Sequence, residues 1–400
     1  MTEPTGPLKG IRVVDLTRVM AGPYATLMLG DMGADVIKIE RPGAGDDTRA
    51  WGPPWIETDG VPRESGYFLS VNRNKRSIVL DLKSEYGQDV LWKLVDSADV
   101  LVENFSPGTM GRLGFDAETV LARKPEMIYC SISGFGQTGP GHDRTAYDLI
   151  IQGMSGMMSV TGPPGQPTKM GVPIADIASG MWAAYAVVSA LFHRERTGEG
   201  QHIDATMLGG QVALLTFQAA IYFASGQVPE MTWNAHPIVA PYQTFPTKDG
   251  HVNIAVGNDR FWHSFTRVME MDEYRDDPRF ADNEGRITNL PELERIIEKR
   301  FTDLTTAEIV EKLDAAGVPC GPILTVPEVF ADAQAQHLGL ERSVDHASLG
   351  KIPTTGFPFS LSKTDPSAHL APPLLGQHTE EVLAELGYTE EEIDQIRSGS

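Results

Sequence analysis

The sequence predicts an α/β fold in which helices cover both faces of a parallel sheet. In the first third of the chain, short apolar segments of strand length alternate with segments whose apolar residues recur at helical spacing. The strand-like segments are 11–16, 35–40, 99–103 and 127–133. Repeated alternation of strands and helices is typical of parallel sheets, because each parallel strand needs a crossover connection.

Two helices are expected between these strands. Tyr24, Leu27 and Met28 recur at helical spacing before Gly33 ends the pattern. A second apolar set, in the segment 90–95, has the same period. Both helices have one apolar stripe, which favours packing against a sheet.

Ligand-binding residues are expected in the loops 17–23, 41–54 and 104–112, because parallel sheets bind ligands beyond the carboxyl ends of their strands. The first of these loops does not carry the GxGxxG fingerprint of nicotinamide enzymes, and Pro23 removes an amide that could bind phosphate. No P-loop, HExxH or GxSxG motif is present. The sequence therefore argues against a dinucleotide-dependent oxidoreductase.

A change of composition near residue 227 predicts a second domain. The segments 242–247 and 251–256 flank an Asp-Gly pair, which is typical of a hairpin. We expect a large domain at 1–226, a smaller α+β domain at 227–324, and a C-terminal segment at 325–400 that returns to the large domain.

Helix-start signals support the later elements. Thr305 with Glu308 forms a capping box, and Gly317 ends the helix that this box begins. Thr389 with Glu392 forms a second box near the C-terminus.

The net charge of the chain argues against one class of binding partner. Lys and Arg total 33 against 54 Asp and Glu, a formal net charge of -21. Such a surface repels a phosphate backbone, so nucleic acid is not expected as a partner. Two cysteines form no disulfide framework, which favours a reducing, cytoplasmic compartment. The N-terminal residues have no signal-peptide pattern.

One long uncharged stretch, 205–229, could span a bilayer by length alone. It contains several Gln, Thr and Gly residues, which favour a helix buried in the protein core over a membrane span. The adjacent uncharged run 177–192 is expected to form a second buried helix, and no membrane association is expected.

Asp176 lies where an apolar extended run gives way to a helical one. One interpretation is a helix N-cap, the common role for Asp at such a position. The other is a reactive carboxylate beside free backbone amides that could stabilise charge on a bound carbonyl. The glycine-containing loop 134–140 likewise allows two interpretations, a tight surface turn or a mobile lid.

Several motifs in order resemble the class III CoA-transferase family, also called the CaiB/BaiF or formyl-CoA transferase family. The segments that carry the resemblance are DLTRVMAGPYA, GADVIKIERPGAGDDTR, VNRNKRSIVLDLK, DVLVENFSPGTM, SISGFGQTGP, the Asp176 segment, HRERTGEGQHID and PPLLGQHTEEVLAELG. They extend over essentially the whole chain. The overall pattern is most similar to succinyl-CoA:glutarate CoA-transferases and related dicarboxylate enzymes.

The resemblance implies a Rossmann-like large domain, a smaller domain, and two chains threaded through each other as an interlocked homodimer. It also implies that Asp176 is the nucleophile. The family's CoA-binding positions correspond here to Val19, Met20, Ala21, Arg41, Leu80, Lys83, Asn104, Phe105 and Arg112. Met20 replaces the glutamine of the formyl-CoA enzyme, which puts that side-chain contact in doubt, and Thr145 replaces a lysine.

This chemistry suits the residues present. Coenzyme A carries several phosphates, so its site needs cations such as Arg41, Lys83 and Arg112 within an otherwise acidic protein. A carboxylate nucleophile divides a slow carboxylate–thioester exchange into easier steps through an aspartyl anhydride and an aspartyl-CoA thioester. One thioester replaces another, so we expect no ATP, no metal and no permanently bound cofactor. Coenzyme A enters as part of the acyl-CoA substrate.

Two other functions stay open. The related 2-methylacyl-CoA racemases use a His–Asp pair, but Tyr147 stands at the histidine position, and His142 lies five residues out of register. A non-catalytic acyl-CoA-binding protein would leave Asp176 without a role.

The acceptor is expected to be a dicarboxylate such as glutarate, with succinyl-CoA as donor. Its far carboxylate needs a cation, for which Arg18, Arg49 and Arg144 are the candidates, although each could equally form a salt bridge. The segment 256–259 does not match the glycine-run loop of the formyl-CoA enzyme, which argues against oxalate.

Overall fold

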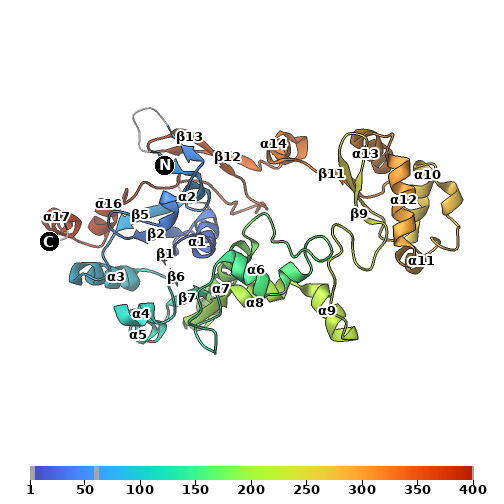
Figure 1. Ribbon diagram of the computed structural model, residues 1–400. Helices are drawn as coiled ribbons and strands as arrows, with labels where there is room; N and C mark the ends of the chain where they lie inside the picture. The colour runs from blue at the N-terminus through green and yellow to red at the C-terminus, as the bar shows by residue number, and fades with distance from the viewer. Residues whose placement is uncertain (1–4, 58–62, 399–400) are drawn as a thin grey trace. The chain divides into compact units, whose positions relative to one another are not determined.

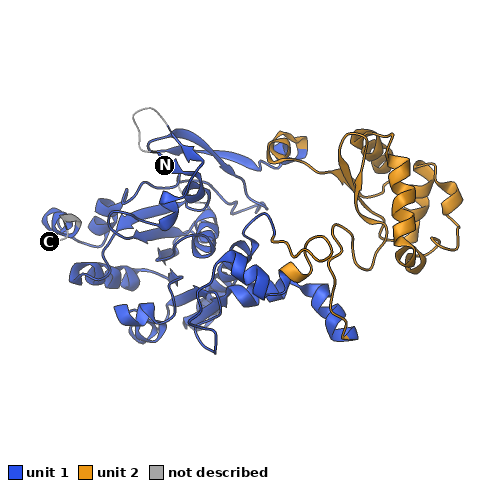
Figure 2. Ribbon diagram, in the orientation of Figure 1, with its two compact units in different colours: residues 1–157, 170–225, 334–400 blue, residues 158–169, 226–333 orange. Residues whose placement is uncertain are grey.

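The computed structural model describes residues 5–57 and 63–398, and it divides into two compact units (Figure 2). The first unit comprises residues 1–157, 170–225 and 334–400, and the second comprises 158–169 and 226–333. The segment 158–169, which the sequence places in the large domain, thus belongs to the second unit.

The first unit is built on a six-stranded sheet with the order β5-β2-β1-β6-β7-β8 (Figure 1). All neighbouring strands pair in parallel. The strands are β1 (Arg12–Asp15), β2 (Asp35–Glu40), β5 (Lys75–Val79), β6 (Val100–Glu103), β7 (Ile128–Ser133) and β8 (Gln201–Thr206). The α/β prediction is confirmed, and the strand order is that of Rossmann folds.

Alternating residues of each strand face opposite layers of helices. On one face, Val14 and Ile37 pack with α3 (Glu85–Ser97), α5 (Ala117–Arg123) and the C-terminal helices. On the other face, Val13 and Val36 pack with α1 (Ala21–Asp31) and α7 (Ile174–Thr197). Because the sheet is covered on both faces, consecutive residues of its central strands are apolar and buried, as in Val13 and Val14 of β1 and in the segment 100–102 of β6.

The shorter elements of this unit lie in the connections between strands. They are η1 (Asp47–Ala50), β3 (Trp55–Ile56), β4 (Glu64–Ser65), α2 (Gly66–Ser70), α4 (Thr109–Leu113) and α6 (Asp148–Met154). The short helix η2 (Met157–Ser159) begins at the last residue of the segment 1–157 and continues into the second unit. The loops after β1 and β6 meet where the strand order reverses, since Arg18 N–H donates to Asn104 Oδ1 at 2.9 Å and Asn104 Nδ2 donates to the Arg18 carbonyl at 2.8 Å. This junction is the usual ligand-binding position in such sheets.

The prediction of two buried helices at 177–192 and 205–229 is correct only in part, since the first stretch lies within the single, half-buried helix α7 but the second is not one helix. The second stretch is the end of β8 followed by two helices, α8 (Met207–Leu214) and α9 (Thr216–Ser225), which meet at a bend of 73°. No residue of α9 is buried, and α7 buries small residues while its other face exposes Tyr185 and Phe192. Apolar composition does not reveal that α9 and one face of α7 are exposed, because an exposed apolar face and a buried one look alike in sequence.

The helix α7 is long and apolar enough to cross a membrane, and α8 with α9 would qualify only as one bent span. Half of the apolar window in α7 is buried within the protein. Length and composition alone are weak grounds for a membrane span, because core helices pass the same test.

The second unit has a three-stranded antiparallel sheet of order β11-β10-β9. Its elements are β9 (Tyr242–Pro246), β10 (His251–Ala255), α10 (Asp259–Val268), η3 (Asp272–Tyr274), α11 (Asn283–Thr288), α12 (Leu290–Phe301), α13 (Thr306–Ala315), β11 (Cys320–Pro322) and α14 (Val326–Ala331). The predicted hairpin is confirmed, with Pro246 opposite His251. The capping box of Thr305 and Glu308 is present as well.

The C-terminal residues complete the first unit. After α15 (Ala333–His337), the hairpin of β12 (Glu341–His346) and β13 (Gly350–Thr355) packs Val344 and Ile352 against Phe68 of α2. The helix α16 (Thr379–Glu385) then joins the core beside β5. The last helix, α17 (Glu390–Ser398), begins at the predicted box, where Thr389 and Glu392 exchange hydrogen bonds.

Candidate active site

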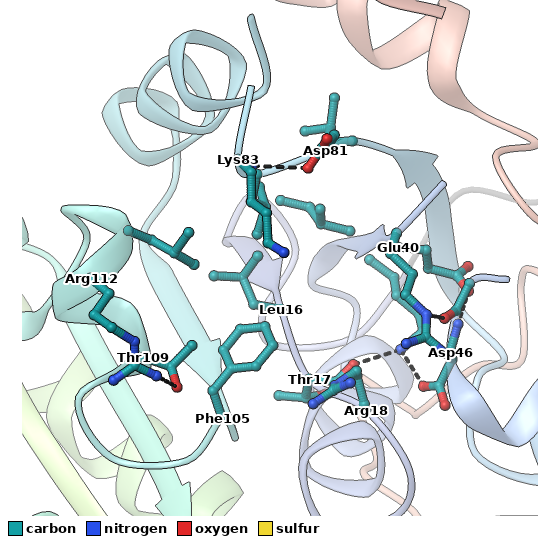
Figure 3. Close-up of a pocket in the computed structure, with 17 residues that line it drawn as sticks. Leu16, Thr17, Arg18, Glu40, Asp46, Asp81, Lys83, Phe105, Thr109 and Arg112 are labelled. Carbon is teal, nitrogen blue, oxygen red and sulfur yellow. Dashed lines mark hydrogen bonds and ion pairs between the residues drawn. The ribbon is translucent and has the colours of Figure 1, made fainter. Parts of the chain in front are cut away.

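A cavity of about 530 Å³ lies beyond the carboxyl ends of β1, β2, β5 and β6 (Figure 3). Leu16 and Phe105 give it apolar walls, and Lys83, Arg112 and Arg18 surround the Phe105 ring in the close-up. A cavity that combines apolar walls with separate cations can bind a nucleotide with phosphates.

The cationic side chains that line this cavity differ in their hydrogen-bond and ion-pair partners. Among the described residues, Lys83 and Arg112 have no carboxylate partner, and Arg112 donates only to Thr109 Oγ1, at 2.8 Å. Arg41 forms an ion pair with Asp47 and donates to the Gly45 carbonyl at 3.0 Å. Lys83 and Arg112 are therefore the cations that can engage a phosphate without losing an existing ion pair.

A second cavity, of about 240 Å³, contains Asp176 and shares Arg18 and Phe105 with the first. The structure brings all nine predicted CoA-binding residues to these two cavities. Arg41, Leu80, Lys83 and Arg112 line the first, Val19, Met20, Ala21 and Asn104 line the second, and Phe105 lines both. Their contacts with CoA stay a prediction.

Asp176 is the third residue of α7, whose N-cap position is occupied by Pro173. The interpretation of Asp176 as an N-cap is therefore wrong. In the described part of the chain no group donates a hydrogen bond to its carboxylate, although the residue is only partly exposed. A carboxylate that is partly buried without donors is unusual, because such groups lose hydration without compensation.

The environment of Asp176 favours its protonated form. Burial raises the pKa of Asp176 to about 7, and the charge of Asp148 adds to the rise. Near neutral pH the Asp176 side chain is therefore divided between its acid and carboxylate forms. Because burial also removes water from the carboxylate, this form is more reactive than the carboxylate of a surface Asp.

Asp148 also fixes the start of α7. Its Oδ1 accepts the Ala175 N–H at 2.8 Å, and its Oδ2 accepts Gln152 Nε2 at 2.7 Å. Gln152 in turn accepts the Met170 N–H at 2.9 Å. One carboxylate thus both orients the turn that carries Asp176 and raises the pKa of Asp176.

The first turn of α1 faces the same cavity. Val19, Met20 and Ala21 line it, and α1 begins without a side-chain cap. The first amides of a helix have no partner within the helix, so they can donate to a ligand oxygen. A carbonyl bound beside Asp176 would meet these donors as negative charge develops on its oxygen.

Gly180 allows α1 and α7 to cross closely at this point. A Cβ atom there would lie 2.6 Å from the Ala21 carbonyl oxygen and 3.1 Å from Tyr24 Cβ. Gly180 is one helical turn after Asp176, so the contact sets the separation between the carboxylate and the start of α1.

The three candidate arginines lie in different surroundings. The Arg49 side chain is largely buried and pairs with both carboxylate oxygens of Glu40 at 2.7 Å, and it does not line the Asp176 cavity. Arg18 lines the cavity and pairs loosely with Asp47 at 3.4 Å. Arg144 lines it without a carboxylate partner among the described residues, and its guanidinium lies 5.1 Å from the centre of the Phe135 ring.

Tyr147 and His142 both line the Asp176 cavity. The His142 Nδ1 atom lies 2.8 Å from the Gly139 carbonyl within its own loop. The adjoining loop 134–140 is tied down at two points, since the Gly136 N–H donates to Ser133 Oγ and the Gln137 N–H donates to Asp204. These bonds describe an ordered turn in this structure and leave its movement untested.

Three residues of the site were not found from the sequence. Asp148 and Gly180 lie in segments that were singled out because of Tyr147 and Asp176. Their roles become visible only in the structure, where Asp148 accepts the Ala175 amide and Gly180 lies against α1. Tyr67 gave no signal. Burial, followed by the charges of Asp176, Asp148 and Asp46, raises the pKa of Tyr67 to about 12, so its neutral hydroxyl lies within the field of the candidate nucleophile.

A Rossmann-type sheet with a cationic cavity and an adjoining buried carboxylate is the arrangement of an acyl-CoA enzyme. The family described as CoA-transferase family III matches residues 8–379, and the chain belongs to this family. It is therefore an enzyme that transfers coenzyme A.

Proteins of known activity or structure are similar to this chain over most of its length. A succinyl-CoA:glutarate CoA-transferase from Mus musculus is 44% identical over 98% of this chain and 89% of the mouse protein. An acetyl-CoA:oxalate CoA-transferase from Acetobacter aceti is 43% identical over 82% of this chain and 83% of its own length. The crystal structure of a CaiB/BaiF family protein from Brucella suis has a TM-score of 0.86 at 42% identity, covering 96% of this chain and 100% of that one.

The raised pKa of Asp176 predicts the pH dependence of the reaction. Only the carboxylate can attack, so kcat/KM should fall about tenfold per pH unit below pH 7 and level off above it. Asp148→Asn keeps an acceptor for the Ala175 amide but removes the like charge, so the falling limb should move to lower pH. Asp96→Asn, at an exposed ion pair, is the charge-matched control. An unmoved limb in the Asp148 variant would contradict the assignment.

Gly180→Ala should reduce kcat/KM by at least about tenfold, because the added methyl group forces α7 away from α1 and displacements near 1 Å are costly in catalysis. The measurement is steady-state transfer together with thermal unfolding. Gly321→Ala is the control, since a Cβ there meets nothing within 4 Å. Wild-type kcat/KM in a folded Gly180 variant would show that the helix separation is unimportant.

Proposed function

We propose that the chain moves CoA from succinyl-CoA to a dicarboxylate such as glutarate, with Asp176 as the covalent nucleophile. The observation that carries the proposal is Asp176 itself, a carboxylate with a raised pKa that lines a cavity beside the start of α1 and receives no hydrogen bond from the residues that the structure describes. The mouse relative, matched over nearly the whole chain, supports the choice of substrates.

In the first half of the reaction, an Asp176 oxygen attacks the donor thioester carbonyl, and the C–S bond breaks to release CoA thiolate. The product is a mixed anhydride between Asp176 and the donor acid. The thiolate then attacks the aspartyl carbonyl, which gives an aspartyl-CoA thioester and the free donor carboxylate. No proton or electron is gained or lost overall.

In the second half, the acceptor carboxylate attacks the aspartyl thioester and again releases CoA thiolate. The new mixed anhydride carries the acceptor, and the thiolate attacks the acceptor carbonyl. The acceptor leaves as its CoA thioester, and Asp176 returns to its carboxylate. Each tetrahedral oxyanion forms beside the first turn of α1, where Met20 and Ala21 offer amides.

The cation cavity supports binding of the CoA moiety. Lys83 and Arg112 would contact its phosphates, with Arg41 releasing Asp47 or sharing it. The pantetheine arm would then pass Phe105, which lines both cavities, and Asn104, which lines the second, to bring the thioester to Asp176.

Arg144 is the residue we propose for the far carboxylate of the acceptor. Of the three candidate arginines it lines the cavity of Asp176 without a carboxylate partner among residues 5–57 and 63–398. A second carboxylate that enters a partly dry cavity needs such a cation, because leaving it unpaired costs several kcal/mol.

A homodimer accounts for the exposed apolar face of α7, α8 and α9. This face, which we call the α7–α9 face, exposes Met181, Trp182, Tyr185, Phe192, Phe217, Tyr222 and Phe223, with 69% of Tyr185 and 81% of Phe223 accessible in one chain. An apolar surface of this extent favours burial against a protein partner, and a second copy is the partner that the family resemblance implies.

Asp176→Ala should abolish transfer while the protein stays folded, because the other described carboxylates of the cavity differ from Asp176: Asp47 pairs with Arg18 and Arg41, and Asp143 is exposed. In the wild type, incubation with donor followed by hydroxylamine or borohydride should modify Asp176, as located by mass spectrometry of peptides. A modification on another residue, or near wild-type turnover by the folded variant, would refute the nucleophile.

Arg144→Met should lower kcat/KM for glutarate at least about tenfold relative to butyrate, because only glutarate has a second carboxylate to bind. Arg18→Met serves as the competing candidate, and oxalate is included because of the Acetobacter aceti relative. If the ratio follows Arg18 instead, the residue is misassigned. If wild-type protein prefers butyrate or oxalate, the glutarate proposal fails.

The dimer should be visible by sedimentation at micromolar concentration. Tyr185→Glu and Phe192→Glu should weaken it, since each puts a charge on the α7–α9 face. Tyr86→Glu, on the exposed surface of α3, is the control. A wild-type chain that sediments as a monomer at all concentrations would refute this part of the proposal.

A further inference from the structure

Beneath the loop that follows β1 lies an ion pair that is shut off from solvent. Lys38 Nζ and Asp46 Oδ2 are 2.9 Å apart, and both side chains are 0% exposed. Lys38 comes from β2, and Asp46 comes from the loop that leads into η1. Both residues lie at the wall of the first cavity, but neither is among the nine predicted CoA-binding residues.

Both members of the pair also hold the backbone of the loop above them. Lys38 Nζ donates to the Thr17 carbonyl at 2.9 Å, and Asp46 Oδ1 accepts the Val19 N–H at 3.2 Å (Figure 3 shows Thr17 and Asp46 joined to the buried amine by dashed lines). Asn104 holds Arg18 between them through its N–H and its carbonyl. Three successive residues of the loop are therefore held by side chains, two of which, Lys38 and Asp46, are fully buried.

The residue at the centre of this arrangement has an unfavourable backbone conformation. Val19 has a φ of 69°, in the left-handed region that β-branched residues avoid. The chain adopts such a conformation only where its surroundings impose it, and such residues concentrate at functional sites. Met20 and Ala21, which follow directly, line the cavity of Asp176 and begin α1.

The pair stays ionised despite its burial. Burial alone would raise the pKa of Asp46, but the Lys38 charge and hydrogen bonds from Thr48 lower it to about 2. Asp15, Glu40 and Lys75 also face this pair from β1, β2 and β5, and the acids help to raise the pKa of Lys38 against the effect of burial. An aliphatic pair of similar volume would fill the same space without this desolvation, so stability alone gives no reason for two buried charges here.

We propose that Lys38 and Asp46 are positioning residues that hold Val19 in its left-handed conformation and thereby fix the first turn of α1 against Asp176. The inference rests on the proposed function, since it assumes that transfer occurs at Asp176. The charges matter because a neutral aliphatic pair offers neither a donor to the Thr17 carbonyl nor an acceptor for the Val19 amide. Loss of the pair should disturb the reacting geometry while the phosphate cations keep their places.

The test uses Lys38→Met, Asp46→Leu and the double variant in the full-length protein, because Leu, unlike Asn, offers no acceptor for the Val19 amide. In all three, kcat should fall at least tenfold, while the KM for acyl-CoA changes less than threefold. The singles leave one buried charge unpaired and should lose thermal stability, whereas the double variant should regain most of it without regaining kcat. A double variant that regains both would show a merely structural pair and overturn the proposal.

A matched control lies at the other end of α1. Arg73 and Asp31 form a buried ion pair at 2.6 Å, and neither lines the two cavities. Arg73→Met and Asp31→Asn should lower the melting temperature in the same way but leave kcat within about twofold. Equal loss of kcat in these controls would mean that the effect is one of general stability.

Substitution of Val19 gives a second, independent readout. In the Lys38→Met/Asp46→Leu background, Val19→Gly should raise kcat several-fold over Val19→Ala, because glycine adopts a positive φ without being held there. The two variants differ by one methyl group, so the main difference between them is the backbone preference. Equal kcat values for the two would overturn the proposal. Covalent trapping on Asp176 in the wild type, measured first, shows separately whether the proposed function itself has failed.

Discussion

The close crossing of α1 and α7 is the constraint on which the rest of the site depends. Because Gly180 has no side chain, the carbonyl of Ala21 approaches α7 one turn after Asp176. The start of one helix, with its free amides, and a carboxylate in the first turn of the other are thereby brought to the same cavity. The sheet order supplies the remaining part, since the loops after β1 and β6 meet only where the order of strands reverses.

This arrangement is costly to the folded state. Asp176 has a pKa of about 7, above its ordinary value, so the folded protein binds a proton that the unfolded chain releases near pH 4. Ionisation of Asp176 therefore lowers the free energy of unfolding progressively as the pH rises from about 4 to about 7. Above pH 7 this loss of stability is complete. Val19 adds backbone strain of about 1–3 kcal/mol on general grounds. Both costs lie at the reacting centre, as expected where geometry serves catalysis at the expense of stability.

The sequence was sufficient for much of the fold and less for the site. Strand and helix patterns located β1, β2, β6, β7 and the hairpin of the second unit, because each has a clear period or turn signal. The strand β5 was missed, since its letters KRSIV contain two charges that are buried only because acidic partners surround them. Asp176 was found through the family resemblance, because its local pattern fits an ordinary N-cap equally well. What no local pattern could give was contact between distant segments, such as Asp148 with Ala175 or Glu40 with Arg49.

The arginine at position 49 shows why charge alone is a weak guide to substrate binding. Arg18, Arg49 and Arg144 are equivalent in sequence terms, since each lies in a loop near the expected site. In the structure the guanidinium of Arg49 lies 3.7 Å from the centre of the Phe68 ring and is matched by Glu40, which fixes the loop that carries Asp46 through the Asp46 N–H. The charge of Arg49 is therefore neutralised by Glu40 within the loop structure beneath the site. In a protein with a net charge of -21 that acts on an anionic thioester and a carboxylate, the cations best suited to substrate binding are those without acidic neighbours. By that criterion we propose Lys83 and Arg112 for the nucleotide and Arg144 for the acid, which would separate the two recognition tasks between two adjoining cavities.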